Sequence, residues 1–347
     1  MTDVGAVQAI APPGPAVRTL TVIARQRELS LVAVMLLLGA FVAVQAPQFL
    51  SVSNLTQVTV FAAIIAIAAV GEAMVVLTRN VDLSVESVIG LVAFVVADVL
   101  AKHILPVPAA IAFGIGLGLV LGMVNGLLVA WLRVPSIVAT LGTLSIYRGF
   151  AFLVAGGKQV TLTDLPAGYT DPARATVLGI VPLFLVIAVV VIIVFAVVLR
   201  QTSFGRSVYA VGSNPEAAEI LGINSRVVTF AVFSLCGLLG GLAGILWGMQ
   251  FGTINATAAT GVTLQVIAAV VVGGVNIFGG SGTVVGAGLG AMFLAFISNA
   301  LILLSLSQFW LQAIYGVVIL VAVGLDAALL RRVQRSNART RTPVSTP

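Results

Sequence analysis

The chain has 347 residues, of which 60% are hydrophobic and only 8% are charged. Soluble proteins carry about 25% charged residues, so this chain has too few to cover the surface of a soluble domain of its size. The composition therefore excludes soluble enzymes and disordered proteins. The net charge of +6 comes from basic residues in short gaps between long apolar runs, not in one patch. That distribution excludes nucleic acid as a partner and is typical of a protein embedded in a lipid bilayer.

Ten apolar runs are long enough to cross the membrane, because a helix needs about 20 apolar residues to span the hydrocarbon core. They cover residues 30–46, 56–78, 84–101, 107–131, 135–154, 177–199, 227–250, 261–279, 284–305 and 309–330. The sequence thus predicts an all-α integral membrane protein, a polytopic bundle of about ten transmembrane helices over residues 30–330. The fifth and eighth runs are the shortest or most interrupted, so eight or nine full spans plus a half-membrane helix fit almost as well.

The lysines and arginines between the runs predict the orientation, because cytoplasmic loops carry an excess of them. If both termini are cytoplasmic, the far side holds only Lys102, Lys158 and Arg174. The cytoplasmic side then holds Arg18, Arg25, Arg27, Arg79, Arg133, Arg200, Arg206, Arg226, Arg331, Arg332, Arg335, Arg339 and Arg341. We therefore expect the N-terminal segment 1–29 and the basic tail 331–347 to lie in the cytoplasm.

Glycines recur at every fourth position in three predicted spans. They are Gly114, Gly118, Gly122 and Gly126 in the fourth span, Gly240, Gly244 and Gly248 in the seventh, and Gly282, Gly286 and Gly290 around the start of the ninth. A stripe without side chains lets two helix backbones approach closely in lipid. These stripes predict tightly packed helix pairs.

The longest predicted cytoplasmic loop covers residues 200–226 and contains a short helix. Either Ser213 or Asn214 can accept a free backbone N–H, and Pro215 suits the first helical turn. Gly222 then favours a left-handed stop. We expect a capped helix of about two turns, which needs a partner surface to be stable.

The largest predicted external loop covers residues 156–175 and is either a docking surface or a simple solvated connection. It contains Gly156-Gly157-Lys158-Gln159, the nearest match in the chain to a phosphate-binding loop. That motif requires a Ser or Thr after the lysine. The chain is therefore not expected to hydrolyse ATP itself.

Metal and cofactor chemistry find no support in the sequence. Cys236 is the single cysteine and His103 the single histidine, so no Cys/His cluster can form. We predict no metal site, no cofactor and no catalytic residue, which also weakens the case for an intramembrane enzyme.

Four motifs in order give the chain a recognisable pattern. They are VDLSVESVIGLVA, VAWLRVPSIVATLGTLSIYRGFAFLVAGG, SNPEAAEILGINSRVVTFAVFSLCGLLGGLAGIL and IAAVVVGGVNIFGGSGTVVGAGLGA. With them the chain, from about residue 30 to 330, resembles the ribose-type permeases of bacterial ATP-binding-cassette (ABC) sugar importers. Residues 78–84, which read TRNVDLS, make the chain most similar to the rhamnose and autoinducer-2 branches of these permeases.

The resemblance implies a multi-pass protein of the bacterial inner membrane that imports a monosaccharide or related sugar, such as rhamnose, autoinducer-2 or ribose. It implies three kinds of partner: cytoplasmic ATPase subunits, a periplasmic sugar-binding protein, and a second permease subunit that is identical or a sister chain. The short helix then matches the coupling helix that docks into an ATPase. Its expected residues are Ser213, Asn214, Pro215, Glu216, Ala217, Ala218, Glu219 and Gly222.

Polar residues inside apolar runs are candidates for the translocation path, because burying them in lipid is costly. The candidates are Asp82, Ser84, Glu86, Asn125, Gln265, Asn276 and Asn299, the last four expected near the midplane. Asp82 and Ser84 fall in the D-L-S motif, whereas Glu86 stands where the resembled family usually has glycine. Asp82 and Glu86 repel each other if both are ionised, so one of them is protonated or paired with Arg79 or Arg148.

A secondary transporter driven by an ion gradient is the main alternative, since buried acids can relay protons. Glu72 and Asp98 are further intramembrane acids of this kind. No motif supports that alternative.

Overall fold

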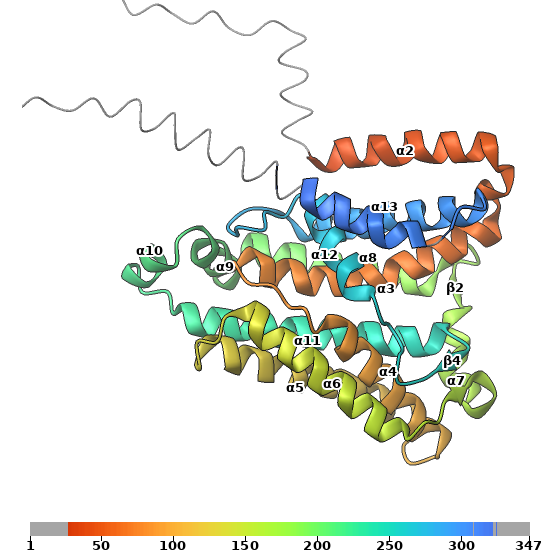
Figure 1. Ribbon diagram of the computed structural model, residues 1–347, viewed down its shortest axis with the longest axis horizontal. Helices are drawn as coiled ribbons and strands as arrows, with labels where there is room; N and C mark the ends of the chain where they lie inside the picture. The colour runs from red at the N-terminus through yellow and green to blue at the C-terminus, as the bar shows by residue number, and fades with distance from the viewer. Residues whose placement is uncertain (1–26, 308, 322–323, 325–347) are drawn as a thin grey trace, which may run out of the picture.

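The structure, a computed structural model, describes residues 27–307, 309–321 and 324 (Figure 1). The predicted terminal segments lie almost entirely outside these residues. The helices are α2 (Arg27–Gln45), α3 (Val52–Leu77), α4 (Val85–Ala101), α5 (Val107–Ala130), α6 (Ser136–Ala155), α7 (Ala167–Thr170), α8 (Leu183–Gln201), α9 (Ser203–Ser213), α10 (Pro215–Ile220), α11 (Ser225–Gln250), α12 (Val262–Val272) and α13 (Val284–Leu303). Short elements are η1 (Pro47–Leu50), η2 (Leu162–Asp164), η3 (Asp171–Ala173), β1 (Val160–Thr161), β2 (Thr176–Val177), β3 (Val181–Pro182) and β4 (Thr253–Ile254).

Seven helices in the described part are long and apolar enough to cross a membrane: α2, α3, α5, α6, α8, α11 and α13. They lie roughly along one direction in Figure 1. A shorter apolar helix covers Phe309–Val321. Helix α3 is buried along most of its length, whereas few residues of α2 and α8 are buried. The arrangement confirms an all-α, multi-pass membrane fold.

The bundle has two distinct ends (Figure 1). The α10 end carries α9, α10 and the connections from α5 to α6 and from α12 to α13. The α7 end carries α7, β4 and the connection from α4 to α5. The lysines and arginines of the loops separate accordingly: Arg79, Arg133, Arg200, Arg206 and Arg226 lie at the α10 end, and Lys102, Lys158 and Arg174 at the α7 end.

Helices α4 and α12 both begin in the middle of the bundle (Figure 1). A non-helical segment, residues 78–84, enters from the α10 end and leads into α4. Residues 255–261 enter from the α7 end and lead into α12. The predicted span 261–279 is therefore wrong in length, because α12 ends at Val272 and the glycine-rich turn after it has positive φ at Gly274 and Gly279.

Glycines bring α5 and α11 into direct backbone contact. A Cβ at Gly118 would lie 2.5 Å from the Gly237 carbonyl oxygen and 2.6 Å from the Gly241 Cα. The predicted α11 stripe faces a different neighbour: Gly240 and Gly244 contact residues of α4. Helix α11 thus carries two glycine faces, which explains how it sits at the centre of the bundle between α5 and α4.

Gly118→Ala is expected to destabilise the protein by about 1–3 kcal/mol, because the added methyl group must push α5 from α11. Gly116 on the same helix is the matched control, since a Cβ there meets nothing within 4 Å. Gly116→Ala is expected to be neutral or to stabilise by up to about 1 kcal/mol through helix propensity. Thermal unfolding in detergent measures the stability of both variants. Equal unfolding midpoints for Gly118→Ala and Gly116→Ala would contradict the close packing of α5 against α11.

A folded segment covers the α7 end. Strands β1 and β4 pair antiparallel, with Val160 opposite Ile254 and Thr161 opposite Thr253. Tyr169 in α7 is fully buried, and its hydroxyl donates a hydrogen bond to the Ile245 carbonyl of α11 at 3.1 Å. Part of the predicted loop 156–175, around Val160, Leu165 and Tyr169, is therefore packed against the bundle.

Candidate functional site

A cluster of buried polar side chains lies where the chain passes from α3 to α4. Asp82 Oδ1 accepts hydrogen bonds from the Ser84 backbone N–H at 2.8 Å and from the Ser84 hydroxyl at 2.6 Å. Asn125 of α5 donates from Nδ2 to Asp82 Oδ2 at 3.2 Å and to Ser84 Oγ at 2.8 Å. Three of the predicted path residues thus form one network, which holds the non-helical segment 78–84 against α5.

Glu72 of α3 lies beside this network and is fully buried. Its Oε1 accepts a hydrogen bond from the Asp82 backbone N–H at 3.1 Å, and the Cys236 sulfur lies 4.0 Å from Oε2. Neither Glu72 nor Asp82 forms an ion pair within the described part of the chain. The cluster therefore holds two acidic side chains among neutral donors.

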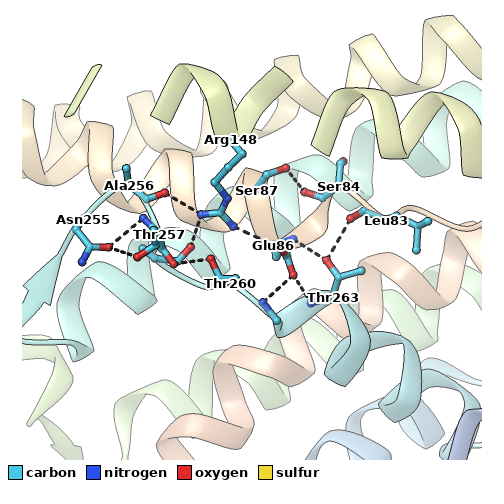
Figure 2. Close-up of polar contacts among 12 residues, drawn as sticks. Leu83, Ser84, Glu86, Ser87, Arg148, Asn255, Ala256, Thr257, Thr260 and Thr263 are labelled. Carbon is cyan, nitrogen blue, oxygen red and sulfur yellow. Dashed lines mark hydrogen bonds and ion pairs between the residues drawn. The ribbon is translucent and has the colours of Figure 1, made fainter. Parts of the chain in front are cut away.

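Glu86 joins the starts of α4 and α12 (Figure 2). Its Oε2 accepts hydrogen bonds from the backbone N–H groups of Gly261 at 2.9 Å and Thr263 at 3.4 Å. In return, the Thr263 hydroxyl oxygen accepts the Glu86 backbone N–H at 3.1 Å, and that hydroxyl donates to the Leu83 carbonyl at 3.2 Å. Each helix thus supplies the capping group for the other, and the carboxylate lies at the positive end of the α12 dipole.

Arg148 of α6 closes the same junction (Figure 2). Its Nη1 donates to the carbonyl oxygens of Ala256 at 2.9 Å and Ala258 at 2.8 Å, and its Nη2 lies 3.6 Å from Glu86 Oε1. Glu86 and Arg148 are each 14% exposed. The guanidinium therefore neutralises Glu86 and holds the segment that leads into α12, which resolves the predicted choice between Arg79 and Arg148 in favour of Arg148.

Two buried amide atoms near these networks have no hydrogen-bond partner in the described residues. They are Asn125 Oδ1 and Gln265 Nε2. Gln265 lies in the first turn of α12, two residues after Thr263. One free acceptor and one free donor suit a ligand that carries hydroxyl groups.

Two predicted midplane residues lie elsewhere. Asn276 is in the turn between α12 and α13 at the α10 end, where its side chain accepts the Phe278 backbone N–H at 2.9 Å. Asn299 lies towards the end of α13 and forms paired amide hydrogen bonds with Asn54, at 2.7 and 3.0 Å. Asn276 therefore lies in a turn and Asn299 in the last turns of a helix, apart from the polar networks around Asp82 and Glu86.

Asn299 instead lines a cavity of about 470 Å³ among α3, α11 and α13. Its lining residues are Gln57, Val58, Phe61, Gln250, Phe251, Ala295, Ser298, Asn299 and Ile302. Two aromatic rings with uncharged amides and a hydroxyl group form a surface suited to a neutral polar solute.

Helix α10 has the predicted caps. The Asn214 side chain accepts the Ala217 backbone N–H at 3.1 Å, Pro215 is the first helical residue, and Gly222 has φ of +81°. Ser213 ends α9 and does not cap α10. Ala218 is only 2% exposed and packs against its own chain.

The outer face of α10 presents a different set of residues. Ile220 is 86% exposed and Leu221 is 78% exposed. Glu216, Ala217 and Glu219 are exposed beside them. Two large apolar side chains flanked by carboxylates form the most prominent feature of this tip, and the sequence reasoning did not single out either of them.

Arg79 connects the polar segment 78–84 to the end of α9, directly before α10. Its guanidinium donates to the carbonyl oxygens of Gly212, at 2.6 Å from Nε, and Ser213. Gly280 in the turn between α12 and α13 donates its backbone N–H to Leu77 at 3.0 Å. The end of α3, the end of α9 and the turn before α13 therefore meet at one point.

At the α7 end, Asp164 is held in a local turn. The Thr161 backbone N–H and hydroxyl donate to Asp164 Oδ2 at 2.8 and 2.7 Å. These hydrogen bonds keep the pKa of the exposed Asp164 carboxyl below its ordinary value. Asp164 thus remains ionised on this surface at neutral pH.

Thr263 and Gly261 were missed as site residues. No sequence signal marks them, because a threonine and a glycine in an apolar run are common in packed membrane helices. Their role follows from the meeting of α4 and α12, which requires the three-dimensional structure.

Comparison with known proteins gives a family and named relatives. Residues 54–323 match the model of the family described as branched-chain amino acid transport system / permease component. The autoinducer 2 import system permease protein LsrC of Salmonella typhi is 41% identical over 318 residues, which cover 91% of this chain and 90% of the relative. The proteins of that name from Escherichia coli (strain K12 / DH10B) and Shigella flexneri are each 39% identical, with 84% of each chain covered. No solved structure matches the chain.

Proposed function

This chain belongs to the branched-chain amino acid transport system / permease component family, and we propose that it forms the membrane path of an ATP-driven importer for autoinducer 2 or a sugar of similar size. The single observation that supports autoinducer 2 as the substrate is the 41% identity to an autoinducer 2 import permease over 91% of this chain. Rhamnose and ribose are the other sugars to be tested.

The meeting of α4 and α12 supports a path near their starts. Discontinuous membrane helices commonly begin at substrate sites, because their free N–H groups and the adjoining non-helical backbone are available there. Here Glu86 and Arg148 occupy that junction and neutralise each other. A sugar has hydroxyl groups and no charge, so it would form hydrogen bonds with the free amide atoms of Asn125 and Gln265 and not with the charged side chains of Glu86 and Arg148.

We also propose ten membrane crossings with the α10 end in the cytoplasm. Seven crossings are the long helices, two are α4 and α12 with their non-helical lead-in segments, and one is the apolar helix Phe309–Val321. The five arginines at the α10 end, against three basic residues at the α7 end, favour this orientation. Both chain termini would then be cytoplasmic.

Docking of a separate ATPase on α10 would couple hydrolysis to the path. The exposed Ile220 and Leu221 offer apolar contacts, and Glu216 and Glu219 can pair with basic residues of the partner. Arg79 donates to the carbonyl groups of Gly212 and Ser213 at the end of α9, directly before α10, and so links this region to the segment that holds Asp82. A periplasmic binding protein would dock at the α7 end, and a second permease subunit would complete the path.

Uptake by proteoliposomes tests the proposal. The importer is reconstituted with its ATPase subunits and its binding protein, and uptake of labelled autoinducer 2 is compared with that of rhamnose and ribose. We expect ATP-dependent uptake of autoinducer 2 that survives collapse of the proton gradient. Uptake that persists without ATP but stops with the gradient would identify a secondary transporter, and preferential uptake of rhamnose or ribose would refute the proposed substrate.

A further inference from the structure

A large cavity opens at the α10 end, away from the proposed path. It has a volume of about 640 Å³ and lies among α2, α8, α9 and α13. Its lining residues are Glu28, Ala196, Leu199, Arg200, Arg206, Tyr209, Thr283, Val284 and Val285. These residues belong to the last turn of α8, the first turns of α2 and α13, and α9. The cavity therefore lies near the ends that the apolar helices α2, α8 and α13 have on the α10 side of the bundle.

The charge in this cavity is net positive, because Arg200 and Arg206 face one acidic residue, Glu28. Arg200 and Arg206 are exposed, and neither guanidinium has a partner in the described part of the chain. The one acidic lining residue, Glu28, already accepts a hydrogen bond from the Thr283 hydroxyl at 2.6 Å. The Tyr209 hydroxyl donates to the Gly282 carbonyl at 2.9 Å. Two cations against one carboxylate leave a net positive charge, which suits a phosphate group.

An apolar groove continues from the cavity toward the middle of the membrane. It has a volume of about 170 Å³ and shares Val285 with the cavity. The small side chains of its alanines and its one glycine leave space between the helices. The lining residues are Ala62, Ala63, Ala66, Leu185, Ala188, Val189, Ile192, Val285, Gly288, Leu289 and Met292. The groove lies between α3, α8 and α13, and few residues of α8 are buried. A narrow apolar groove on such a surface suits a hydrocarbon chain.

We propose that the cavity and the groove together form a binding site for one anionic phospholipid. The phosphate of the headgroup would face Arg200 and Arg206, and an acyl chain would lie in the groove beyond Val285. The joined groove favours a lipid over a free phosphate ion, and the two cations favour an anionic lipid over a zwitterionic one. Because α9 leads directly into α10, a bound lipid would also brace the base of the proposed docking helix.

Native mass spectrometry of the full-length chain in detergent tests the proposal with phosphatidylglycerol as the probe. Phosphatidylglycerol is expected to bind more tightly than phosphatidylethanolamine. The double variant Arg200→Gln/Arg206→Gln is expected to bind it about 30-fold more weakly, since each basic residue contributes about 1 kcal/mol near an anionic lipid. Val285→Trp, which obstructs the passage into the groove, is expected to weaken binding while both arginines remain.

The matched control is Arg133→Gln/Arg226→Gln, which removes two exposed arginines from the same end but outside the cavity. This variant is expected to bind the lipid like the unmodified chain. Equal binding of phosphatidylethanolamine, or competition by glycerol phosphate at the same concentration, would overturn the proposal. Unchanged lipid binding by Arg200→Gln/Arg206→Gln, with loss of ATPase co-purification, would assign the cavity to a protein partner instead.

Discussion

Replacing both Ile220 and Leu221 with aspartate is expected to abolish substrate-stimulated ATP hydrolysis in the reconstituted importer. The two side chains are 86% and 78% exposed at the tip of α10, so the change leaves the fold of the permease intact. A few hot-spot residues, each contributing about 2 kcal/mol or more, dominate most interfaces, and we expect this pair to supply at least one such contribution. We therefore expect ATPase affinity to fall by about 30-fold or more, measured by co-purification and by hydrolysis in proteoliposomes.

Leu132→Asp is the matched control. Leu132 is 65% exposed at the same end of the bundle, in the connection between α5 and α6. The same change in polarity there is expected to leave hydrolysis and co-purification unchanged. If the Ile220/Leu221 variant keeps normal substrate-stimulated hydrolysis, α10 is not the docking helix.

Arg148→Met is expected to lower the free energy of unfolding by about 3–5 kcal/mol and to stop transport. Removing the guanidinium leaves the carboxylate of Glu86 buried without a counter-ion, which is costly in a low-dielectric interior. It also frees the carbonyl oxygens of Ala256 and Ala258 from their hydrogen bonds. Thermal unfolding in detergent measures the loss of stability.

Two further variants distinguish the loss of the Glu86–Arg148 ion pair from a nonspecific effect of the substitution on stability. Lys102→Met removes the cation of an exposed pair on the same helix as Glu86, where Lys102 Nζ lies 2.7 Å from Asp98 Oδ2, and is expected to cost at most about 1 kcal/mol. Adding Glu86→Gln to Arg148→Met removes the unpaired charge and is expected to recover most of the lost stability. If Arg148→Met and Lys102→Met unfold at the same temperature, the buried pair does not stabilise the junction.

The local features of the chain were predictable because they depend on neighbouring residues. Asn214, Pro215 and Gly222 define α10 through capping, a fixed φ and a left-handed stop, and these signals act within a few residues. The membrane class likewise follows from composition. Helix α9 was not predicted. Ser203–Ser213 is amphipathic and lies between two apolar runs, so a search for apolar runs alone does not identify it as a helix.

The arrangement at the centre of the bundle was not predictable. Hydropathy runs unbroken from residue 261 to beyond Val272, so the apolar run does not reveal that α12 is a half-length helix. Asp82 and Glu86 stand four residues apart, yet Asp82 binds Asn125 and Glu86 binds Arg148. The partners come from α5 and α6, and only the packing of distant helices selects them.

The side of the membrane that carries α10 tests the central claim most directly. Glu219→Cys, in a chain whose buried Cys236 is replaced by alanine, provides one exposed thiol on α10. A membrane-impermeant maleimide is predicted to label it in inverted vesicles and not in intact cells, and bound ATPase should protect it. Labelling in intact cells would place α10 outside the cytoplasm and contradict a path driven by a cytoplasmic ATPase.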